Sequence, residues 1–502
     1  MTVQDYLKII DETIEKGPYK DNWASLANHP VPKWYSNGKF GIFIHWGVYS
    51  VPAFGNEWYP RNMYLKGTPE FEHHVKTYGP HNKFGYKDFI PMFRAERFDA
   101  AKWMELFKKA GATYVVPVAE HHDGFQMYRS DLCRFNAAEM GPHRDILGEL
   151  KTAAEQAGIT LCASSHRAEH YFFMNGGRTF DSDVNDPEYE EFYGPACADS
   201  AFYPEISSTE NVEATGASKE HLENWLARTC ELVDKYKPGL VYFDWWIQNH
   251  SFKPYLKKFA AYYYNRAAEW GKEVTINYKY NAYGYTCAVY DIERGQLAGI
   301  NPRTWQTDTS IAKNSWGYTE NNDFKKPEDI ICDFVDIVSK NGCLLLNIGP
   351  RADGTITDEE TNVLCEIGRW LETNGEGIYG TTYWHQFGEG PTEVPEGAFS
   401  DTVRPPFTSK DIRFTYKGGN VYAFVMKAPE DGIVTITSMR EKTGTNAEGK
   451  FINHERDYII TGVSLLGHDK PLDFERTAEA LTVRLPEGIR SDYPVCLKIT
   501  VD

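Results

Sequence analysis

The sequence predicts an α/β protein in which a (β/α)8-like barrel is followed by a C-terminal antiparallel β-sandwich. Short apolar runs alternate with amphipathic stretches from about residue 39 to about residue 379. Near-continuous apolar runs are typical of strands that are buried on both faces of a parallel sheet. After about residue 385 helical periodicity disappears, and alternating segments joined by turn residues indicate antiparallel strands. We therefore expect a catalytic domain over 1–384 and a sandwich domain over 385–502.

The expected barrel strands are short and rich in β-branched and aromatic residues. They include 41–48 (GIFIHWGV), 114–119 (YVVPVA), 159–165 (ITLCASS), 240–246 (LVYFDWW), 274–278 (VTINY) and 344–348 (LLLNI). Helical spacing is found between and around them, at 98–112, 145–158, 221–237, 254–272 and 327–340. Thr357 and Glu360 have the spacing of a capping box for one further helix.

Repeated strand–helix units indicate a parallel sheet, which can close into a barrel or stay open and doubly wound. No glycine-rich phosphate-binding motif follows an expected strand, which disfavours the nucleotide-binding versions of these folds. In the C-terminal region, Ile412–Tyr416 and Val421–Val425 are joined by Lys-Gly-Gly-Asn, which predicts a hairpin.

Composition excludes several kinds of partner. The formal net charge of -18 argues against nucleic acid and anionic membranes, because both bind basic surfaces. The sequence has no run of eighteen apolar residues and no signal-peptide pattern at its start, and its nine cysteines form no C-x-x-C pair. Reduced thiols and a cytoplasmic location are the simplest expectation, which a leader removed from this chain would change.

Polar residues that could carry chemistry follow or end several expected strands. They are His45, His121, His122, Asp244, Glu293 and Trp316. The carboxyl ends of parallel barrel strands meet at one mouth, and burying polar groups there costs free energy unless they have a function. Asp244 and Glu293 are carboxylates, and two carboxylates across one mouth are the minimum requirement for glycoside hydrolysis.

The segment 34–64 (WYSNGKFGIFIHWGVYSVPAFGNEWYPRNMY) resembles the opening signature of glycoside hydrolase family 29, the α-L-fucosidases. The segments AGATYVVPVAEHHDGFQMY, GLVYFDWW, DIERG, SWGY and SKNGCLLLNIGPRADGTI resemble its later blocks in the same order. The resemblance implies a retaining exo-α-L-fucosidase that removes terminal fucose from fucosylated oligosaccharides or glycoconjugates by double displacement. It also implies that no metal ion or organic cofactor is needed.

The resemblance also implies roles for single residues. It makes Asp244 the nucleophile and Glu293 the acid/base, with Glu57 and Asp291 as alternatives for the second role. The positions that match sugar-hydroxyl ligands are His45, Glu57, Trp58, His121 and His122, and Trp316 matches an aromatic residue near the methyl group of fucose. This chain has Lys279 where some members of the family have an arginine, so that contact stays open.

Two other functions are compatible with parts of the sequence. The segment His166-Arg167-Ala168-Glu169-His170 matches the inverted zinc-protease motif H-x-x-E-H, but that motif needs a helix, and here it follows a strand-like run. The other rival is a carbohydrate-binding protein without catalytic activity. The presence of both carboxylates favours an enzyme over this second alternative.

Overall fold

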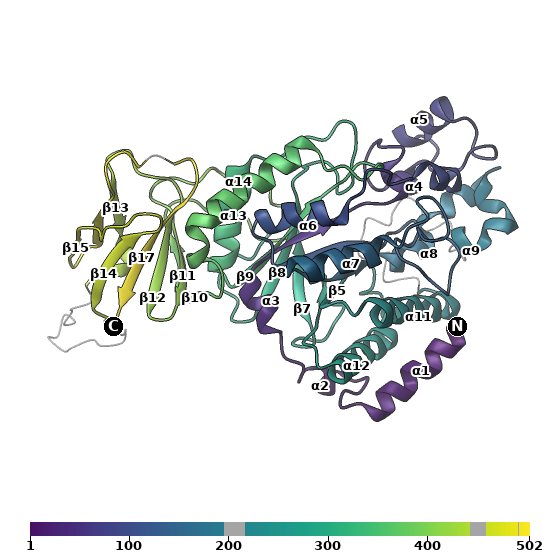
Figure 1. The fold of residues 1–502 in the computed structure, drawn as a ribbon, viewed down its shortest axis with the longest axis horizontal. Helices are drawn as coiled ribbons and strands as arrows, with labels where there is room; N and C mark the ends of the chain where they lie inside the picture. The colour runs from purple at the N-terminus through teal and green to yellow at the C-terminus, as the bar shows by residue number, and fades with distance from the viewer. Residues whose placement is uncertain (195–215, 442–457, 490) are drawn as a thin grey trace.

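The computed structural model describes residues 1–194, 216–441, 458–489 and 491–502. Its larger part is a closed barrel of eight parallel strand positions (Figure 1). The strands are β1 (Phe40–Ile44), β2 (Tyr114–Glu120), β3 (Thr160–Leu161) with its continuation β4 (Ala163–Ser165), β5 (Leu240–Phe243), β6 (Thr275–Tyr278), β7 (Val289–Glu293), β8 (Trp305–Ser310) and β9 (Gly342–Ile348). Because β1 pairs with both β2 and β9, the sheet closes, and the open alternative is wrong.

Long helices cover the outside of the barrel at most of its connections. They are α6 (Ala100–Lys109), α7 (Ile146–Ala157), α11 (Lys219–Tyr236), α12 (Lys253–Trp270), α13 (Pro327–Ser339) and α14 (Asp358–Asn374). Asp99 caps α6 by accepting a hydrogen bond from Lys102 N. Thr357 caps α14 in the same way, as its spacing from Glu360 predicts. In the described chain, the connections on either side of β7 contain no helix.

The first long helix, α1 (Val3–Lys16), packs against α11 and α12 at the edge of the barrel. Shorter helices lie before β1 and in the connections β1–β2 and β4–β5. They are α2 (Trp23–Leu26), α3 (Lys33–Gly38), α4 (Tyr59–Asn62), α5 (Pro69–Thr77), α8 (His170–Phe173) and α9 (Glu190–Tyr193). None of the helices described is both long and apolar enough to cross a bilayer. Eight cysteines lie in the described ranges, and all eight are free thiols.

The C-terminal part consists of two antiparallel sheets. The larger sheet contains β10 (Thr382–Glu389), β11 (Ile412–Lys417), β12 (Asn420–Val425), β17 (Val495–Val501) and β14 (Ile460–Leu465) in that order, and the smaller contains β13 (Ile433–Ile436), β16 (Leu481–Arg484) and β15 (Phe474–Arg476). Alternate apolar side chains from both sheets form one core. The predicted hairpin is confirmed, because Lys417 pairs with Asn420 and the two glycines between them have positive φ angles.

The C-terminal sheets lie beside α13 and α14, at the opposite end of the molecule from α5 (Figure 1). A buried ionic contact joins the two parts. Arg413 on β11 pairs with Asp336 on α13, and Asp336 also accepts a hydrogen bond from Lys340 at 2.5 Å. On α14, Trp370 packs against Phe424 of β12 with 6.0 Å between ring centroids. The barrel and the sandwich therefore share buried apolar and charged contacts.

Candidate active site

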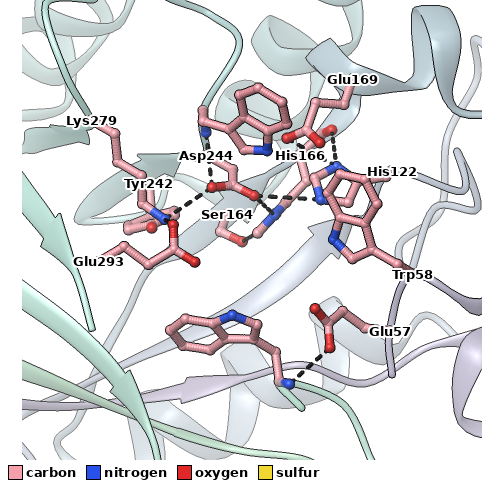
Figure 2. A network of polar contacts seen from close by, with 12 residues as sticks. Glu57, Trp58, His122, Ser164, His166, Glu169, Tyr242, Asp244, Lys279 and Glu293 are labelled. Atoms are coloured by element: carbon pink, nitrogen blue, oxygen red, sulfur yellow. Dashed lines mark hydrogen bonds and ion pairs between the residues drawn. The ribbon is translucent and has the colours of Figure 1, made fainter. Parts of the chain in front are cut away.

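A cavity of about 500 Å³ opens at the carboxyl ends of the barrel strands. All eight site residues predicted from the sequence line it, and Figure 2 shows several of them around Asp244. They are His45, Glu57, Trp58, His121, His122, Asp244, Glu293 and Trp316. Four of these end a strand or directly follow one, and His122 comes one residue later. Trp316 does not, because β8 ends at Ser310 and Trp316 lies in the loop that follows. Its expected place at a strand end is therefore wrong, although its expected place in the site is confirmed.

Asp244 directly follows β5 and is the most heavily bonded carboxylate of the cavity. Its Oδ1 accepts hydrogen bonds from Trp245 N at 2.8 Å and Lys279 Nζ at 3.0 Å, and its Oδ2 lies 2.9 Å from Nδ1 of His166. Burial acts to raise the pKa of Asp244, but the charges of Lys279 and His166 outweigh it and hold this pKa well below the usual range. Asp244 is therefore ionised at neutral pH.

Lys279 directly follows β6 and bridges the two predicted catalytic carboxylates (Figure 2). Its Nζ lies 3.0 Å from Oδ1 of Asp244 and 2.6 Å from Oε2 of Glu293. These two oxygens cannot be farther apart than the sum of the two distances. A shared cation that brings one oxygen of each group this close favours the separation of about 5–5.5 Å between the carboxyl groups of retaining glycosidases over the roughly 6.5–9.5 Å of inverting ones.

Glu293 ends β7, and the pKa of its carboxyl group is shifted in the opposite direction to that of Asp244. Burial raises the pKa of Glu293 to about 7, and the negative charge of Asp244 adds to this effect while Lys279 opposes it. A carboxyl group with this pKa is protonated in a large fraction of molecules at neutral pH. The two carboxyl groups therefore differ in their protonation state, as an acid and a nucleophile must.

The two alternatives for the acid/base have other partners. Glu57 accepts hydrogen bonds from Trp316 N at 2.8 Å and Ser315 Oγ at 3.1 Å, so it fixes the loop that carries Trp316. Asp291 is only 1% exposed and accepts a hydrogen bond from Gln306 of β8. Neither geometry suits proton exchange with a substrate as well as that of Glu293.

Buried imidazoles form one wall of the cavity. Burial lowers the pKa of His45 and His121 well below the usual range and that of His122 to about 3, so these rings are neutral at physiological pH. Nδ1 of His121 has no hydrogen-bond partner in the part of the chain that the structure describes. Neutral imidazoles both donate and accept hydrogen bonds, which suits the recognition of sugar hydroxyl groups.

Indole rings line other parts of the cavity. Trp58 packs against His122 and stacks with Trp245 at a centroid distance of 6.4 Å. Trp316 packs against His45, and the Arg294 guanidinium group lies 4.6 Å from its centroid. Such rings offer apolar surface to the C–H groups of a sugar.

The zinc-motif alternative is wrong. Arg167–Glu169 form a 3-10 turn, so the two histidines do not share a helix face. His166 faces Asp244 and Ser164, whereas Nδ1 of His170 donates to the carbonyl oxygen of His122.

In the described part of the chain, two groups of three residues have ligand atoms close enough together to hold a metal ion. One group is His45, His121 and His166, and the other is His122, His166 and Asp244. Both groups need His166, whose two ring nitrogens already have partners 2.9 and 2.7 Å away. His166 is therefore placed to orient Asp244, and a metal ion would have to displace its hydrogen bonds with Asp244 and Ser164.

Sequence reasoning did not assign His166, Lys279, Tyr242 or Asp308 to the site, although all four line the cavity. Tyr242 donates a hydrogen bond to Asp308 at 2.8 Å, and Asp308 lies 3.6 Å from Lys279. The signal for His166 and Lys279 was their place after apolar strand-like runs, the same signal that identified Asp244.

A barrel mouth with one ionised and one protonated carboxyl group, beside neutral imidazoles and indole rings, is typical of a glycoside hydrolase. Comparison with known families makes this class specific. The family model described as Alpha-L-fucosidase matches residues 7–376, and the model described as Alpha-L-fucosidase C-terminal domain matches residues 405–500. The chain therefore belongs to the α-L-fucosidase family, glycoside hydrolase family 29.

Individual relatives agree with this result. The chain is 30% identical to human tissue alpha-L-fucosidase over 434 residues, which cover 84% of this chain and 81% of the relative. It is 30% identical to human plasma alpha-L-fucosidase, with 93% and 89% covered. The solved structure of the Thermotoga maritima alpha-fucosidase is 29% identical and superposes with a TM-score of 0.72, covering 96% of this chain and 100% of that one. The similarity is to enzymes, which disfavours the alternative of a carbohydrate-binding protein without catalytic activity.

Proposed function

We propose that this α-L-fucosidase is a retaining exo-enzyme that hydrolyses terminal α-L-fucosyl linkages of glycans by double displacement. The observation that carries the proposal is the bridge made by Lys279 between Asp244 and Glu293. The bridge holds one oxygen of each carboxyl group close to the other, which supports the short separation of a retaining enzyme over the longer one that leaves room for a water molecule in an inverting enzyme.

In the first step, ionised Asp244 attacks the anomeric carbon from the β face while the bond to the leaving oxygen breaks. Protonated Glu293 donates its proton to that oxygen, which leaves as a hydroxyl group on the rest of the glycan. In the second step, Glu293 removes a proton from water, and the water oxygen attacks the β-fucosyl ester from the α face. Asp244 is released as a carboxylate, and the product is α-L-fucose.

The other predicted residues would bind the fucose ring. The neutral imidazoles of His45, His121 and His122 suit contacts with its hydroxyl groups, and the rings of Trp58 and Trp316 suit its apolar surfaces. His166 contacts Asp244 directly and would orient the nucleophile. No step of this mechanism needs a metal ion or an organic cofactor.

The test is the anomeric configuration of the first product. Proton NMR recorded during the first seconds to minutes of hydrolysis, before mutarotation, is expected to show α-L-fucose. If β-L-fucose forms first, double displacement is rejected while the family assignment stands.

A further inference from the structure

Phe399 lines the same cavity as Asp244 and Glu293, although it belongs to the connection between β10 and β11. Its side chain is 60% exposed. Its backbone has a φ of 57°, in the left-handed region that is unfavourable for a bulky residue. A large apolar side chain that is held exposed in a strained conformation at the edge of a catalytic cavity indicates a contact with a ligand.

The chain around Phe399 is fixed to the barrel at the acid/base itself. Residues 396–401, called the returning segment below, run back from the C-terminal part to the end of β7. Phe399 N donates a hydrogen bond to the carbonyl oxygen of Glu293 at 2.9 Å, and Ser400 N donates to the carbonyl oxygen of Arg294 at 2.8 Å. The position of the Phe399 ring is therefore tied to the position of Glu293.

Side-chain contacts add to this attachment. Asp401 is nearly buried and accepts hydrogen bonds from Lys325 Nζ and, at 2.5 Å, from Thr309 Oγ1. Gly295 lets the returning segment approach, because a Cβ atom at this position would lie 1.7 Å from the carbonyl oxygen of Gly397. The returning segment is therefore held against β7 and β8 by hydrogen bonds and by close backbone packing.

A second exposed aromatic residue lines the cavity near Glu293. Tyr280, which directly follows Lys279, is 43% exposed and also has a left-handed backbone, with a φ of 54°. A neighbouring cavity of about 250 Å³ shares Lys279, Tyr280 and Glu293 with the first, and residues 396–398 form part of its wall. Open space therefore continues past Glu293, between Tyr280 and the returning segment.

We propose that Phe399 and Tyr280 form the binding site for the leaving-group sugar, a pyranose residue whose C–H face packs on the Phe399 ring. This inference rests on the proposed function, in which Glu293 protonates the leaving oxygen. The sugar that carries this oxygen must lie on the Glu293 side of the cavity, where both exposed rings lie. The hydroxyl group of Tyr280 and the carboxylate of Glu396, which lines the second cavity, supply polar partners for its hydroxyl groups.

The test compares a substrate that has a leaving-group sugar with one that has none. The first is a fucosyl disaccharide, taken as the best-cleaved of four α-L-fucosyl-galactose and α-L-fucosyl-N-acetylglucosamine isomers. The second is α-L-fucosyl fluoride. Phe399→Ala is expected to lower the ratio of kcat/KM for the disaccharide to kcat/KM for the fluoride by roughly three- to tenfold, the size of one lost aromatic contact. Tyr280→Ala is expected to lower the same ratio.

Two further variants make the test specific. Phe399→Trp keeps an aromatic face and is expected to keep the ratio near that of the wild type. Phe474→Ala removes a partly exposed phenylalanine from β15, remote in the sandwich, and is expected to leave both rates unchanged. An unchanged ratio in Phe399→Ala, or an equal loss on both substrates, would overturn the inference. A wild-type protein that hydrolyses neither substrate would overturn the proposed function itself.

Discussion

Lys279 Nζ lies 2.6 Å from Oε2 of Glu293, so the acid/base proposed for this enzyme is in direct contact with a buried cation. The same cation contacts Asp244. Burial acts to lower the pKa of Lys279, but the surrounding carboxylates, Asp244 first among them, raise it well above the usual range, so the lysine stays charged. Lys279 therefore acts on both catalytic pKa values, and in the same direction.

Removal of this charge gives the first prediction. In Lys279→Met the pKa of Asp244 and that of Glu293 both rise, because each carboxylate loses a neighbouring positive charge. Asp244 must be ionised and Glu293 protonated, so both limbs of the profile of kcat/KM against pH are expected to move to higher pH. The basic limb, which the pKa of Glu293 of about 7 is expected to place near neutral pH in the wild type, should move clearly upward.

Lys279→Arg is the matched control, because it keeps the charge while changing the geometry of the donors. It is expected to lower kcat without a comparable shift of either limb. Identical pH profiles in the wild type and Lys279→Met would contradict the role given to this charge.

The second prediction separates Glu293 from the other candidates for the acid/base. Glu293→Ala is expected to lower kcat/KM on natural fucosides by about 10²–10⁴-fold. It should affect a dinitrophenyl fucoside much less, because that leaving group needs no protonation. Added azide is expected to give α-fucosyl azide, since it attacks the fucosyl-enzyme from the face where water normally enters.

Glu57→Ala and Asp291→Asn serve as comparisons. Both are expected to slow the two substrates to a similar extent, because neither residue is placed to protonate the leaving group. If one of them shows the selective loss and Glu293→Ala does not, the acid/base has been assigned to the wrong residue.

The third prediction concerns the contact between the barrel and the sandwich. Arg413→Met leaves the buried carboxylate of Asp336 with Lys340 as its remaining cationic partner. Breaking a buried ion pair in this way is expected to cost about 3–5 kcal/mol of the free energy of unfolding. The measurement is the midpoint of thermal unfolding, which should fall clearly below that of the wild type.

Arg97→Met tests whether this loss is specific to a buried pair. Arg97 pairs with Asp353 at 3.4 Å, but its side chain is 69% exposed. Its replacement is expected to change the unfolding midpoint little. If the unfolding midpoint changes equally in Arg413→Met and Arg97→Met, the buried Arg413 contact between barrel and sandwich does not have the stabilising role given to it.

Strand–helix alternation was enough to predict a parallel α/β fold, because most of the barrel strands are apolar along their whole length, but it left the closed barrel and the open sheet as alternatives. β8 is the exception. Its sequence from Trp305 to Ser310 is largely polar, yet all six residues are buried. Asp308 on this strand is satisfied by Tyr242 and lies near Lys279. An apolar-run criterion misses such a strand, since its polar side chains are buried with hydrogen-bond partners and only Asp308 among them lines the cavity.

Residues that line the cavity could be predicted where they lie at the end of a strand or in a segment that resembles the family. Local sequence could not reveal pairs such as His166 with Asp244, which are 78 positions apart. His166 belongs to a short match to a zinc motif, whose two histidines have different partners in the folded chain. The place of Phe399 was harder still to predict, because it depends on a segment that returns from the second part of the chain.

The proposed double-displacement mechanism depends most directly on Asp244 as the nucleophile. A 2-deoxy-2-fluoro-fucosyl fluoride should form the intermediate and then break down slowly, because the fluorine atom destabilises the positively charged transition states. Intact-mass measurement is expected to show one added deoxyfluorofucosyl group per chain, and peptide mapping should place it on Asp244. A covalent label on Glu293, Glu57 or any residue other than Asp244 would contradict the account.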